Sequence, residues 1–344
     1  MRAFLMAATL ALAPFTQFTT GVNAQATDPV AAFYKGKNLN MLVGVSAGGA
    51  YDLTLRLVAR HIVRFIPGNP TPVPQNMTGA TGLVMANFLY NVAPKDGTYI
   101  GLIQNGLPTF QAVGMEGAQF DARRLEWIGS PAPTIETMIA YKKRTGVATI
   151  EDARQREVIV GSIGSSGITY MYPLMLNDMA GTKFRMVPGY TGSGALNLAM
   201  ERGEVDARNN SWGSVKANKP EWIKNGDIAV LTYSGRKQPD LANVPHLEDI
   251  IKDKTDLAVF KVVTAGSQLG HPFAMAPGVP ADRLAAMRKA FAEMLKSSDF
   301  IKEATAAQID IDFVDPDEMR QVVAELFSTP QEVRDRARKY FDRK

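Results

Sequence analysis

The sequence of 344 residues contains no cysteine and only three histidines. Without cysteine, the chain can have no disulfide framework, no thiol nucleophile and no cysteine-linked lipid anchor. The histidines are scattered and show no ligand spacing typical of zinc, so we expect no metal site. We expect no cofactor either, because no glycine loop is followed by a Walker lysine and Gly192-Ser193-Gly194 lacks the rest of a dinucleotide-binding fingerprint.

The sequence also lacks a basic block and any low-complexity tract. Lys and Arg number 38 against 34 Asp and Glu, and this surplus is spread along the chain, so we expect no nucleic-acid partner. A pI near 9.1 fits an anionic small ligand better than a cationic one. With 46% hydrophobic and 21% charged residues the chain is globular, and its length predicts two domains at about 150 residues each.

No apolar run reaches the roughly 20 residues that a membrane-spanning helix needs. The N-terminal run over residues 4–15 follows Arg2, and Ala24 and Ala26 supply the small residues that a signal peptidase reads. We therefore expect residues 1–26 to be a signal peptide that is cleaved after Ala26. The remaining chain is expected to be exported and soluble, and its avoidance of thiols favours the periplasm.

Short apolar segments rich in β-branched residues alternate with longer segments of helical period, which is the α/β pattern. Most of the strands lead into a glycine loop and then a helix. The predicted strands are 38–45, 71–75, 99–104, 158–160 and 184–187. The glycine loops are 48–49, 79–82, 161–167 and 189–194, and the helices after them end near residues 65, 91, 179 and 202.

Two extended segments divide the chain. Residues 128–141 and residues 270–280 both contain proline, and an amphipathic helix over 281–295 follows the second segment. We interpret both segments as crossings between two lobes. This predicts a first lobe made of residues 27–136 and 270–344, and a second lobe made of residues 137–269.

The segment Gly44-Val45-Ser46-Ala47-Gly48 matches G-x-S-x-G between a strand and a helix, which is the context of a hydrolase nucleophile. A secreted serine hydrolase using Ser46 is therefore an alternative function. Against it, the chain reaches this serine after one strand, so no earlier loop can supply a second oxyanion donor, and no histidine has a recognisable motif around it. We interpret Ser46 as a hydroxyl donor in a binding loop and expect no enzymatic activity.

The glycine loops that enter helices predict a site for an anion. Free backbone N–H groups at a helix start, together with about half a positive charge from the helix dipole, bind an anion without any Arg or Lys. One such loop would more simply be a connection between a strand and a helix. Two such loops, one in each lobe, favour a carboxylate ligand held between the lobes.

Six segments between residues 37 and 206 carry motifs of one known family, and the resemblance covers nearly all of the chain after residue 26. They are residues 37–52, 74–82, 93–98, 161–166, 187–192 and 203–206. They are similar, in this order, to a first strand with its glycine loop, an asparagine and glycine segment, a Pro-Asp-Gly turn, a Gly-Ser-x-Gly loop, a Val-Pro-Tyr-x-Gly stretch and a Gly-x-Val-Asp motif. Together they resemble the periplasmic receptors of tripartite tricarboxylate transporters, the TctC-like or Bug-type binding proteins.

The resemblance implies a type II periplasmic binding protein fold, in which two α/β lobes close on a carboxylate in the cleft between them. It implies ligand-binding residues on both sides: Ser46, Ala47, Gly48, Gly49 and Tyr51 in the first lobe, and Gly164, Ser165, Ser166, Thr169, Tyr190, Asn209 and Asn210 in the second. It also implies a monomeric solute-binding receptor that delivers a di-, tri- or aromatic carboxylate to the permease subunits of a membrane transporter. A membrane sensor kinase is an alternative partner for the same fold.

The sequence departs from the family near the first loop. Tyr51 stands where the family has a threonine, and a phenol that turned into the cleft would favour longer or aromatic carboxylates. Arg208 suggests a clamp for a second carboxylate, although we expect it to be a solvated surface arginine. Trp212 is expected to be a core residue rather than a ligand wall.

Overall fold

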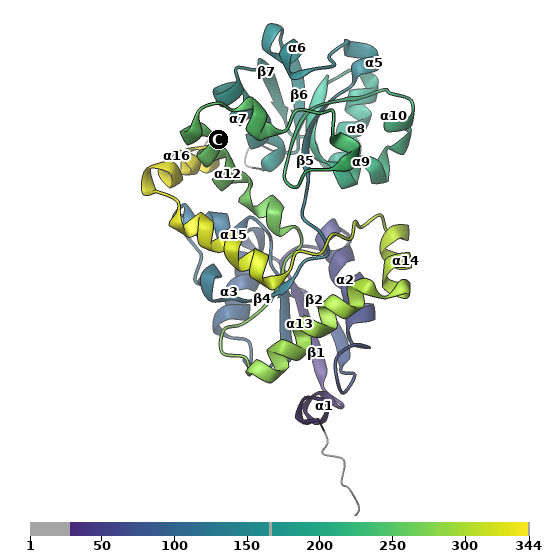
Figure 1. Cartoon of the computed structure of the whole chain (residues 1–344), viewed down its shortest axis with the longest axis vertical. Coiled ribbons are helices and arrows are strands. Elements are labelled where there is room, and N and C mark those ends of the chain that lie inside the picture. Colours follow the sequence, from purple (N-terminus) through teal and green to yellow (C-terminus); the bar gives the residue numbers. More distant parts are fainter. Residues whose placement is uncertain (1–27, 165–166, 343–344) are drawn as a thin grey trace, which may run out of the picture.

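The computed structural model describes residues 28–164 and 167–342, so the predicted signal peptide and the predicted site residues Ser165 and Ser166 lie outside the described residues. The described chain forms two lobes that are joined by a waist (Figure 1). Each lobe contains a five-stranded sheet with helices packed on it. The predicted α/β class is confirmed.

The sheet of the first lobe has the strand order β2-β1-β3-β10-β4. Strand β1 pairs in parallel with β2 and β3, whereas β10 is antiparallel to both β3 and β4. Because β10 lies between two early strands, the chain must return to this lobe after it has built the other. The strands are β1 (Asn38–Val43), β2 (Thr71–Asn76), β3 (Tyr99–Leu102), β4 (Glu126–Gly129) and β10 (Phe273–Met275).

The sheet of the second lobe has the strand order β7-β6-β8-β5-β9. Strand β6 pairs in parallel with β7 and β8, and β5 is antiparallel to β8 and β9. The strands are β5 (Glu136–Ala140), β6 (Val158–Ser162), β7 (Phe184–Pro188), β8 (Ala207–Ser211) and β9 (Ala229–Ser234).

Helices cover the first sheet because its strands carry apolar side chains on both faces. In β1, Met41 belongs to the buried cluster under α2 and α13, while the next residue, Leu42, belongs to the cluster under α3, α4 and α15. This alternation follows from the period of two in a strand. The helices of this region are α1 (Pro29–Tyr34), α2 (Ala50–Ile62), α3 (Leu83–Asn91), α4 (Leu107–Ala112), α13 (Ala281–Lys296), α14 (Ser298–Ala306), α15 (Pro316–Ser328) and α16 (Gln331–Asp342), with short 3₁₀ turns at Ala80–Gly82 and Ala122–Arg124.

The second sheet is enclosed in the same way, and one of its helices also reaches the first lobe. Helix α12 packs against α7 of the second lobe and against α4, α15 and α16 (Figure 1). On the opposite face, α8, α9 and α10 share a separate buried cluster. The helices are α5 (Lys142–Thr145), α6 (Ile150–Gln155), α7 (Ile168–Ala180), α8 (Ser193–Arg202), α9 (Trp212–Asn218), α10 (Pro220–Lys224), α11 (Leu247–Ile250) and α12 (Lys254–Leu269), with a 3₁₀ turn at Pro239–Leu241.

The chain crosses the waist between β4 and β5, and again between α12 and β10. The two crossings touch at Gly270, whose φ is +63°. A Cβ atom at this position would lie 1.8 Å from the carbonyl oxygen of Ala132, so both the backbone angle and the close approach require glycine. We retain the lobe boundaries at 136/137 and 269/270 as a proposal.

A third segment, residues 309–314, runs beside the first crossing. Ser130 and Val314 form an isolated β-bridge, and the N–H of Asp312 donates to the carbonyl of Pro131 at 2.8 Å. The waist is therefore three segments wide, although only two of them connect the lobes.

The predicted strand, glycine loop and helix units occur in the structure with boundaries within three residues of the predicted ones. Within the described ranges, no helix is both long enough and apolar enough to span a membrane.

Candidate ligand-binding cleft

The parallel strands of both sheets end at the waist, and ligands of open α/β sheets bind beyond these carboxyl ends. Five loops follow β1, β2, β3, β6 and β7, and β8 leads directly into α9. The loops are residues 44–49, 77–82, 103–106, 163–167 and 189–192, and none contains Asp, Glu, Lys or Arg. A ligand held by these loops therefore meets neutral hydrogen-bonding groups.

The first loop presents the start of α2. Ser46, Ala47, Gly48 and Gly49 are exposed, and a Cβ atom at either glycine would meet nothing within 4 Å. Gly49 is the N-cap of α2 and supplies no side-chain cap, so the N–H groups of the first helical turn are available to an acceptor from outside the helix. The four predicted residues of this loop therefore lie together, beside an uncapped helix start.

Asp52 holds the first loop in place. Its buried carboxylate accepts from the Gly48 N–H at 2.9 Å, from Arg56 Nε at 3.0 Å and from Asn76 Nδ2 at 2.8 Å. These donors, Arg56 first, lower the pKa of Asp52 to about 2, so the carboxylate is charged at any physiological pH. Asp52 thus accepts the hydrogen bond of one loop N–H group, that of Gly48, and holds the backbone of the loop in place.

Tyr51 points toward the waist. Its hydroxyl accepts from the Asn105 N–H at 3.1 Å and faces the carbonyl of Gly270 at 3.5 Å. Its ring lies against the ring of His271, with the centroids 4.2 Å apart. Burial raises the pKa of Tyr51 above its ordinary value, and the phenol stays protonated. The hydroxyl therefore connects the first lobe to the second crossing.

The corresponding loop of the second lobe precedes α7, whose N-cap Gly167 also provides no side-chain cap. Ser162 Oγ donates to the carbonyl of Gly164 at 3.2 Å, and Thr169 Oγ1 accepts from the Ile163 N–H at 3.3 Å. A Cβ atom at Gly164 or Gly167 would meet open space. Gly164 and Thr169 thus belong to one loop that opens outward.

The loop before α8 also leads into a helix start without a side-chain cap and has open glycines. Its N-cap is Gly192, again without a side-chain cap, and Cβ atoms at Gly189, Gly192 and Gly194 would meet nothing within 4 Å. Tyr190 packs instead against the buried cluster that contains Val205, and its ring edge lies 3.3 Å from where a Cβ of Gly161 would be. The backbone of this loop is open, whereas the ring of Tyr190 is largely a packing element.

Asn209 and Asn210 are both buried on β8. The Asn209 amide donates to Glu136 Oε2 at 3.1 Å and to the Thr137 carbonyl at 3.2 Å, so its side chain is bound to the start of β5. Its Oδ1 atom is buried without a hydrogen-bond partner among the described residues. The carbonyl of Asn210 accepts from Thr137 Oγ1 at 2.8 Å. These two residues lie beneath the loops rather than in them.

Arg208 is fully buried. The expectation of a solvated surface arginine is wrong, because α8 covers the face of the sheet from which this side chain projects. Trp212 is buried as expected, with its indole N–H donating to Asp240 at 2.7 Å, but it also lines the cavity described below.

The three histidines are engaged away from Ser46. His61 contacts Glu303 and Arg64, and His246 lies 3.0 Å from the carbonyl of Gly235. His271 Nδ1 lies 2.8 Å from Thr54 Oγ1, and burial lowers its pKa to about 4. Within residues 28–164 and 167–342, no three His, Asp or Glu side chains are grouped as metal ligands.

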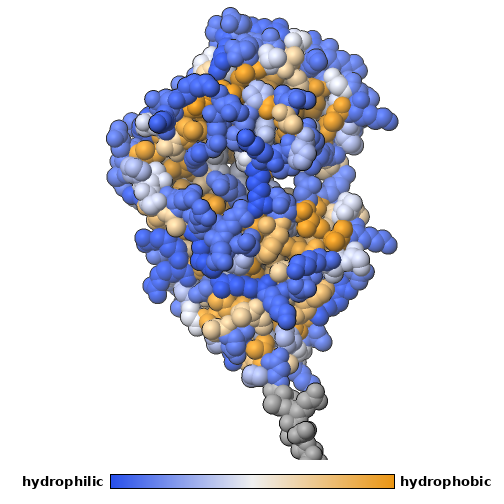
Figure 2. All heavy atoms as spheres, in the orientation of Figure 1, coloured by the Kyte–Doolittle hydropathy of each residue, from blue (hydrophilic) through white to orange (hydrophobic). Residues whose placement is uncertain are grey.

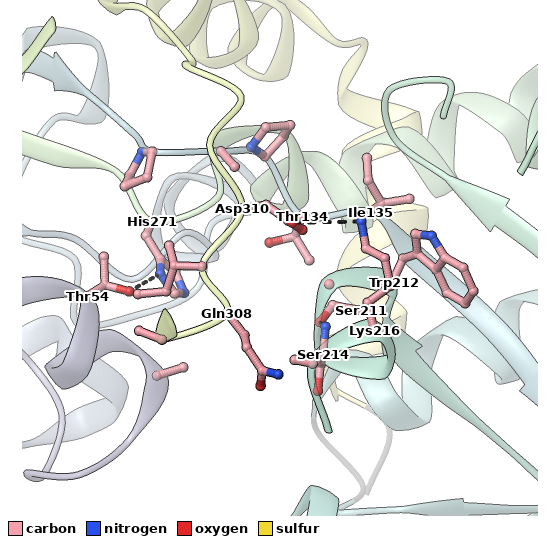
Figure 3. A pocket seen from close by; sticks show the side chains of 18 of the residues that line it. Thr54, Thr134, Ile135, Ser211, Trp212, Ser214, Lys216, His271, Gln308 and Asp310 are labelled. Atoms are coloured by element: carbon pink, nitrogen blue, oxygen red, sulfur yellow. Dashed lines mark hydrogen bonds and ion pairs between the residues drawn. The ribbon is translucent and has the colours of Figure 1, made fainter. Parts of the chain in front are cut away.

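A cavity of about 380 Å³ lies between the lobes, beside the first crossing (Figure 3). In the space-filling view the waist is hollowed between the lobes (Figure 2). The first lobe contributes Thr54 and the 307–310 segment, and the second contributes Ser211, Trp212 and Lys216. Apolar walls come from Leu53, Ile135, Trp212 and Ile309, while Ser214, Lys216, Gln308 and Asp310 supply polar groups.

The cavity adjoins the first loop and the end of β8. Of the ten predicted site residues that the structure describes, none lines it, but it begins at Ala50, directly after the first loop, and at Ser211, directly after Asn210. Thr54 could have been found from the sequence, since it lies one helical turn after Ala50. Gln308 and Asp310 could not, because only the tertiary fold brings them to the waist.

Comparison with known protein families finds no matching family, and no curated protein sequence is detectably similar. Solved structures are similar over most of the chain. A TctC solute-binding protein from Polaromonas without ligand is 17% identical, with a TM-score of 0.67 over 87% of this chain and 98% of that one. MatC from Rhodopseudomonas palustris with bound malate is 19% identical, with a TM-score of 0.59 over 87% and 99%. An R. palustris protein with adipate is 18% identical, with a TM-score of 0.61 over 88% and 97%.

This chain has the two-lobed fold of the periplasmic binding proteins. The fold class that the sequence resemblance implied is confirmed, and one of the similar structures is that of a TctC solute-binding protein.

Proposed function

We propose that this protein is a periplasmic solute-binding receptor that captures a small carboxylate between its lobes. The observation that carries the proposal is that α2, α7 and α8 each begin after a glycine N-cap without any side-chain cap. Each follows a parallel strand of its sheet, so we infer that these helix starts face the space between the lobes. The fold supports it, because similar structures were solved with malate and with adipate.

The uncapped helix starts can provide the binding energy. A hydrogen bond to a charged acceptor contributes about 1.5 to 3 kcal/mol. Two or three such bonds from each lobe, less the free-energy cost of closing the lobes, would leave a binding free energy of about 8 kcal/mol. This corresponds to micromolar affinity. Asp52 prepares the first loop for this role because it fixes the loop before a ligand arrives.

The cavity beside the first crossing would hold the body of the ligand. Its volume of about 380 Å³ falls in the range typical of small-molecule sites. Its apolar walls, Leu53, Ile135 and Ile309, suit a hydrocarbon chain or an aromatic ring that extends from a carboxylate at the first loop. We therefore propose a di-, tri- or aromatic carboxylate as the ligand.

Lobe closure around the ligand would produce the form that a membrane permease of the tripartite tricarboxylate type recognises. In this proposal residues 1–26 direct export, the monomer acts in the periplasm, and the permease subunits are its partners. The protein performs no chemistry, which agrees with the engagement of all three histidines away from Ser46.

Thermal unfolding with a panel of ligands tests the proposal. A ligand at 100 times its dissociation constant adds about 2.7 kcal/mol to the free energy of unfolding. We expect malate, adipate or benzoate to raise the melting temperature by several degrees, while the matching amides do not. Equal stabilisation by amides and sugars would contradict carboxylate recognition. Ester hydrolysis that Ser46→Ala abolishes would show the protein to be a hydrolase instead.

A further inference from the structure

Arg208 is a buried cation whose hydrogen-bond partners are all neutral. Its side chain is fully enclosed, and its nitrogen atoms donate to the carbonyl and Oγ of Ser193, to Asn197 Oδ1 and to the carbonyl of Asn209 at 2.8 to 3.1 Å. Among the described residues, no carboxylate forms an ion pair with it. Burial lowers the pKa of Arg208 to about 10, so the guanidinium remains charged at neutral pH.

Glu136 is the acidic residue whose charge affects the pKa of Arg208, but it lies on the other face of the sheet. The register pairs Ile139 with Arg208, and strand alternation sends the side chains of Arg208 and Glu136 to opposite faces. Arg208 contacts α8, whereas Glu136 contacts Asn209 and Ser267 of α12. Burial also raises the pKa of Glu136, which favours its neutral form. Glu136 is therefore a poor counter-ion for Arg208.

The guanidinium lies directly behind the start of α8. Ser193 is the first residue of this helix, and it receives hydrogen bonds from Arg208 at both its carbonyl and its hydroxyl. The N-cap, Gly192, supplies no side-chain acceptor, and Cβ atoms at Gly189 and Gly192 would meet nothing within 4 Å, so this loop is open. Because the cleft loops contain no charged side chain, Arg208 is a fixed positive charge next to a surface of neutral donors.

We propose that Arg208 is a positioning and specificity residue that makes the α8 side of the cleft select a negatively charged group on the ligand. It does not touch the ligand; it holds Ser193 in place and adds its charge to the positive end of α8. The proposal rests on the proposed carboxylate-binding function and assigns the second carboxylate of a dicarboxylate to the start of α8.

The physical reason is that an N–H donor prefers a carboxylate to an amide oxygen only within hydrogen-bond distance, whereas a buried charge adds an attraction for the carboxylate that acts over a longer distance. Water is excluded around Arg208, so its field is screened less than the field of a surface arginine. A ligand carboxylate would also provide the counter-charge that this guanidinium lacks.

Asn197→Asp is the sharpest test, because Asn197 Oδ1 lies 2.8 Å from Arg208 Nη1 and is buried. The substitution keeps the size of the side chain and the hydrogen bond, and it places a carboxylate against the guanidinium. Asn243→Asp, at an exposed position of the same lobe, makes the same chemical change far from this contact and is the matched control. Arg208→Gln is a second variant that removes the charge directly.

The experiment measures dissociation constants by calorimetry for adipate, its monoamide and its diamide, up to 50 mM. In the wild type and in Asn243→Asp we expect adipate to bind more tightly than the diamide. In Asn197→Asp and in Arg208→Gln we expect that preference to fall about tenfold, the effect of one partly screened charge, with diamide affinity changed less than threefold. Asn197→Asp should fold, because it pairs a buried charge, and its melting temperature verifies this.

An unchanged preference in a folded Asn197→Asp would overturn the role of Arg208 and leave the proposed function standing. Equal weakening of adipate and diamide would also overturn it, since that result describes a purely structural residue. A wild type that binds neither malate nor adipate would instead contradict the proposed carboxylate function, and this inference with it.

Discussion

Arg236 of the second lobe and Glu318 of the first lobe form an ion pair that joins the lobes beside the waist. Both carboxylate oxygens of Glu318 lie 2.5 Å from Arg236 Nη2, and Nη1 lies 2.6 Å from Asp312. Arg236 follows β9, and Glu318 lies in α15, which packs on β4. Strands β9 and β4 are the sheet edges next to the crossings, whereas β2 and β7 are the edges at the far side of the cleft. The ion pair is therefore on the hinge side.

This location predicts that the Arg236 ion pair opposes closure. When the lobes rotate about the crossings to close the cleft, groups on the hinge side must separate. A partly exposed pair contributes about 0.2 to 1 kcal/mol, so we expect Arg236→Gln to tighten adipate binding by up to about fivefold and to reduce the radius of gyration in solution scattering. Arg185→Gln, which breaks a pair within the second lobe, is the control. Weaker binding in Arg236→Gln would show that the pair supports the closed state.

Tyr51 is predicted to contribute to stability more than to ligand affinity. Tyr51→Phe removes the hydroxyl that links Asn105 to Gly270 and keeps the ring against His271. The loss of a buried hydrogen bond should cost about 0.5 to 1.5 kcal/mol and lower the melting temperature by a few degrees. We expect adipate affinity to change less than threefold in calorimetry. A tenfold loss of affinity at an unchanged melting temperature would place the hydroxyl in the ligand site instead.

His271 is predicted to make the protein acid-sensitive. Burial lowers the pKa of His271 in the folded protein from 6.5 to about 4. Between these two pH values the unfolded chain binds a proton at His271 and the folded chain does not. The contribution of the neutral His271 to the free energy of unfolding is fully present above pH 6.5 and is lost as the pH falls toward 4. Because the ring is partly exposed, we expect a loss of about 1 to 3 kcal/mol.

Urea unfolding at pH 7.5, 6 and 4.5 checks this for the wild type and His271→Asn, which keeps a polar group near Thr54. The free energy of unfolding should fall less steeply with acid in the variant. Parallel pH profiles for the two proteins would mean that His271 is protonated equally in both states.

The strand and loop pattern could be predicted because it is local. Leu39, Met41 and Leu42 show their burial in the spacing of apolar residues, and Gly48 and Gly49 mark the loop before α2. The place of β10 in the first sheet could not be predicted, because it depends on pairings between residues more than a hundred positions apart. Local chemistry determines the elements, and long-range packing determines the sheet order.

The site was predictable only as a set of loops. The loops 161–167 and 189–194 were predicted because glycine loops before helices have a sequence signature, but the directions of the Tyr51 and Arg208 side chains have none. Charge alone suggested that Arg208 is on the surface, and only the packing of α8 on the sheet shows that it is buried. Asp310, which lines the cavity, comes from the far end of the chain.

Glu136 is predicted to make the protein less stable as the pH rises, which is opposite to the effect of His271. Its carboxyl group is buried on β5 and receives hydrogen bonds from Asn209 Nδ2 at 3.1 Å and Ser267 Oγ at 3.4 Å. Burial raises its pKa above the ordinary 4.5, and these two donors and Arg208 only partly offset that effect. The folded protein therefore keeps its proton at a pH where the unfolded chain has released it, so the free energy of unfolding falls as the pH rises above 4.5.

Glu136→Gln keeps the shape of this side chain and removes its titration. The unpartnered Oδ1 of Asn209 offers a nearby acceptor for the new amide. We expect the variant to match the wild type at pH 4.5 and to be more stable at pH 8, as measured by urea unfolding at both values. The phenols of Tyr51 and Tyr172 also interact electrostatically with Glu136. Burial raises the pKa of both phenols, so they stay neutral between pH 4.5 and 8. A variant that is equally destabilised at both pH values would show that Glu136 acts through its hydrogen bonds alone.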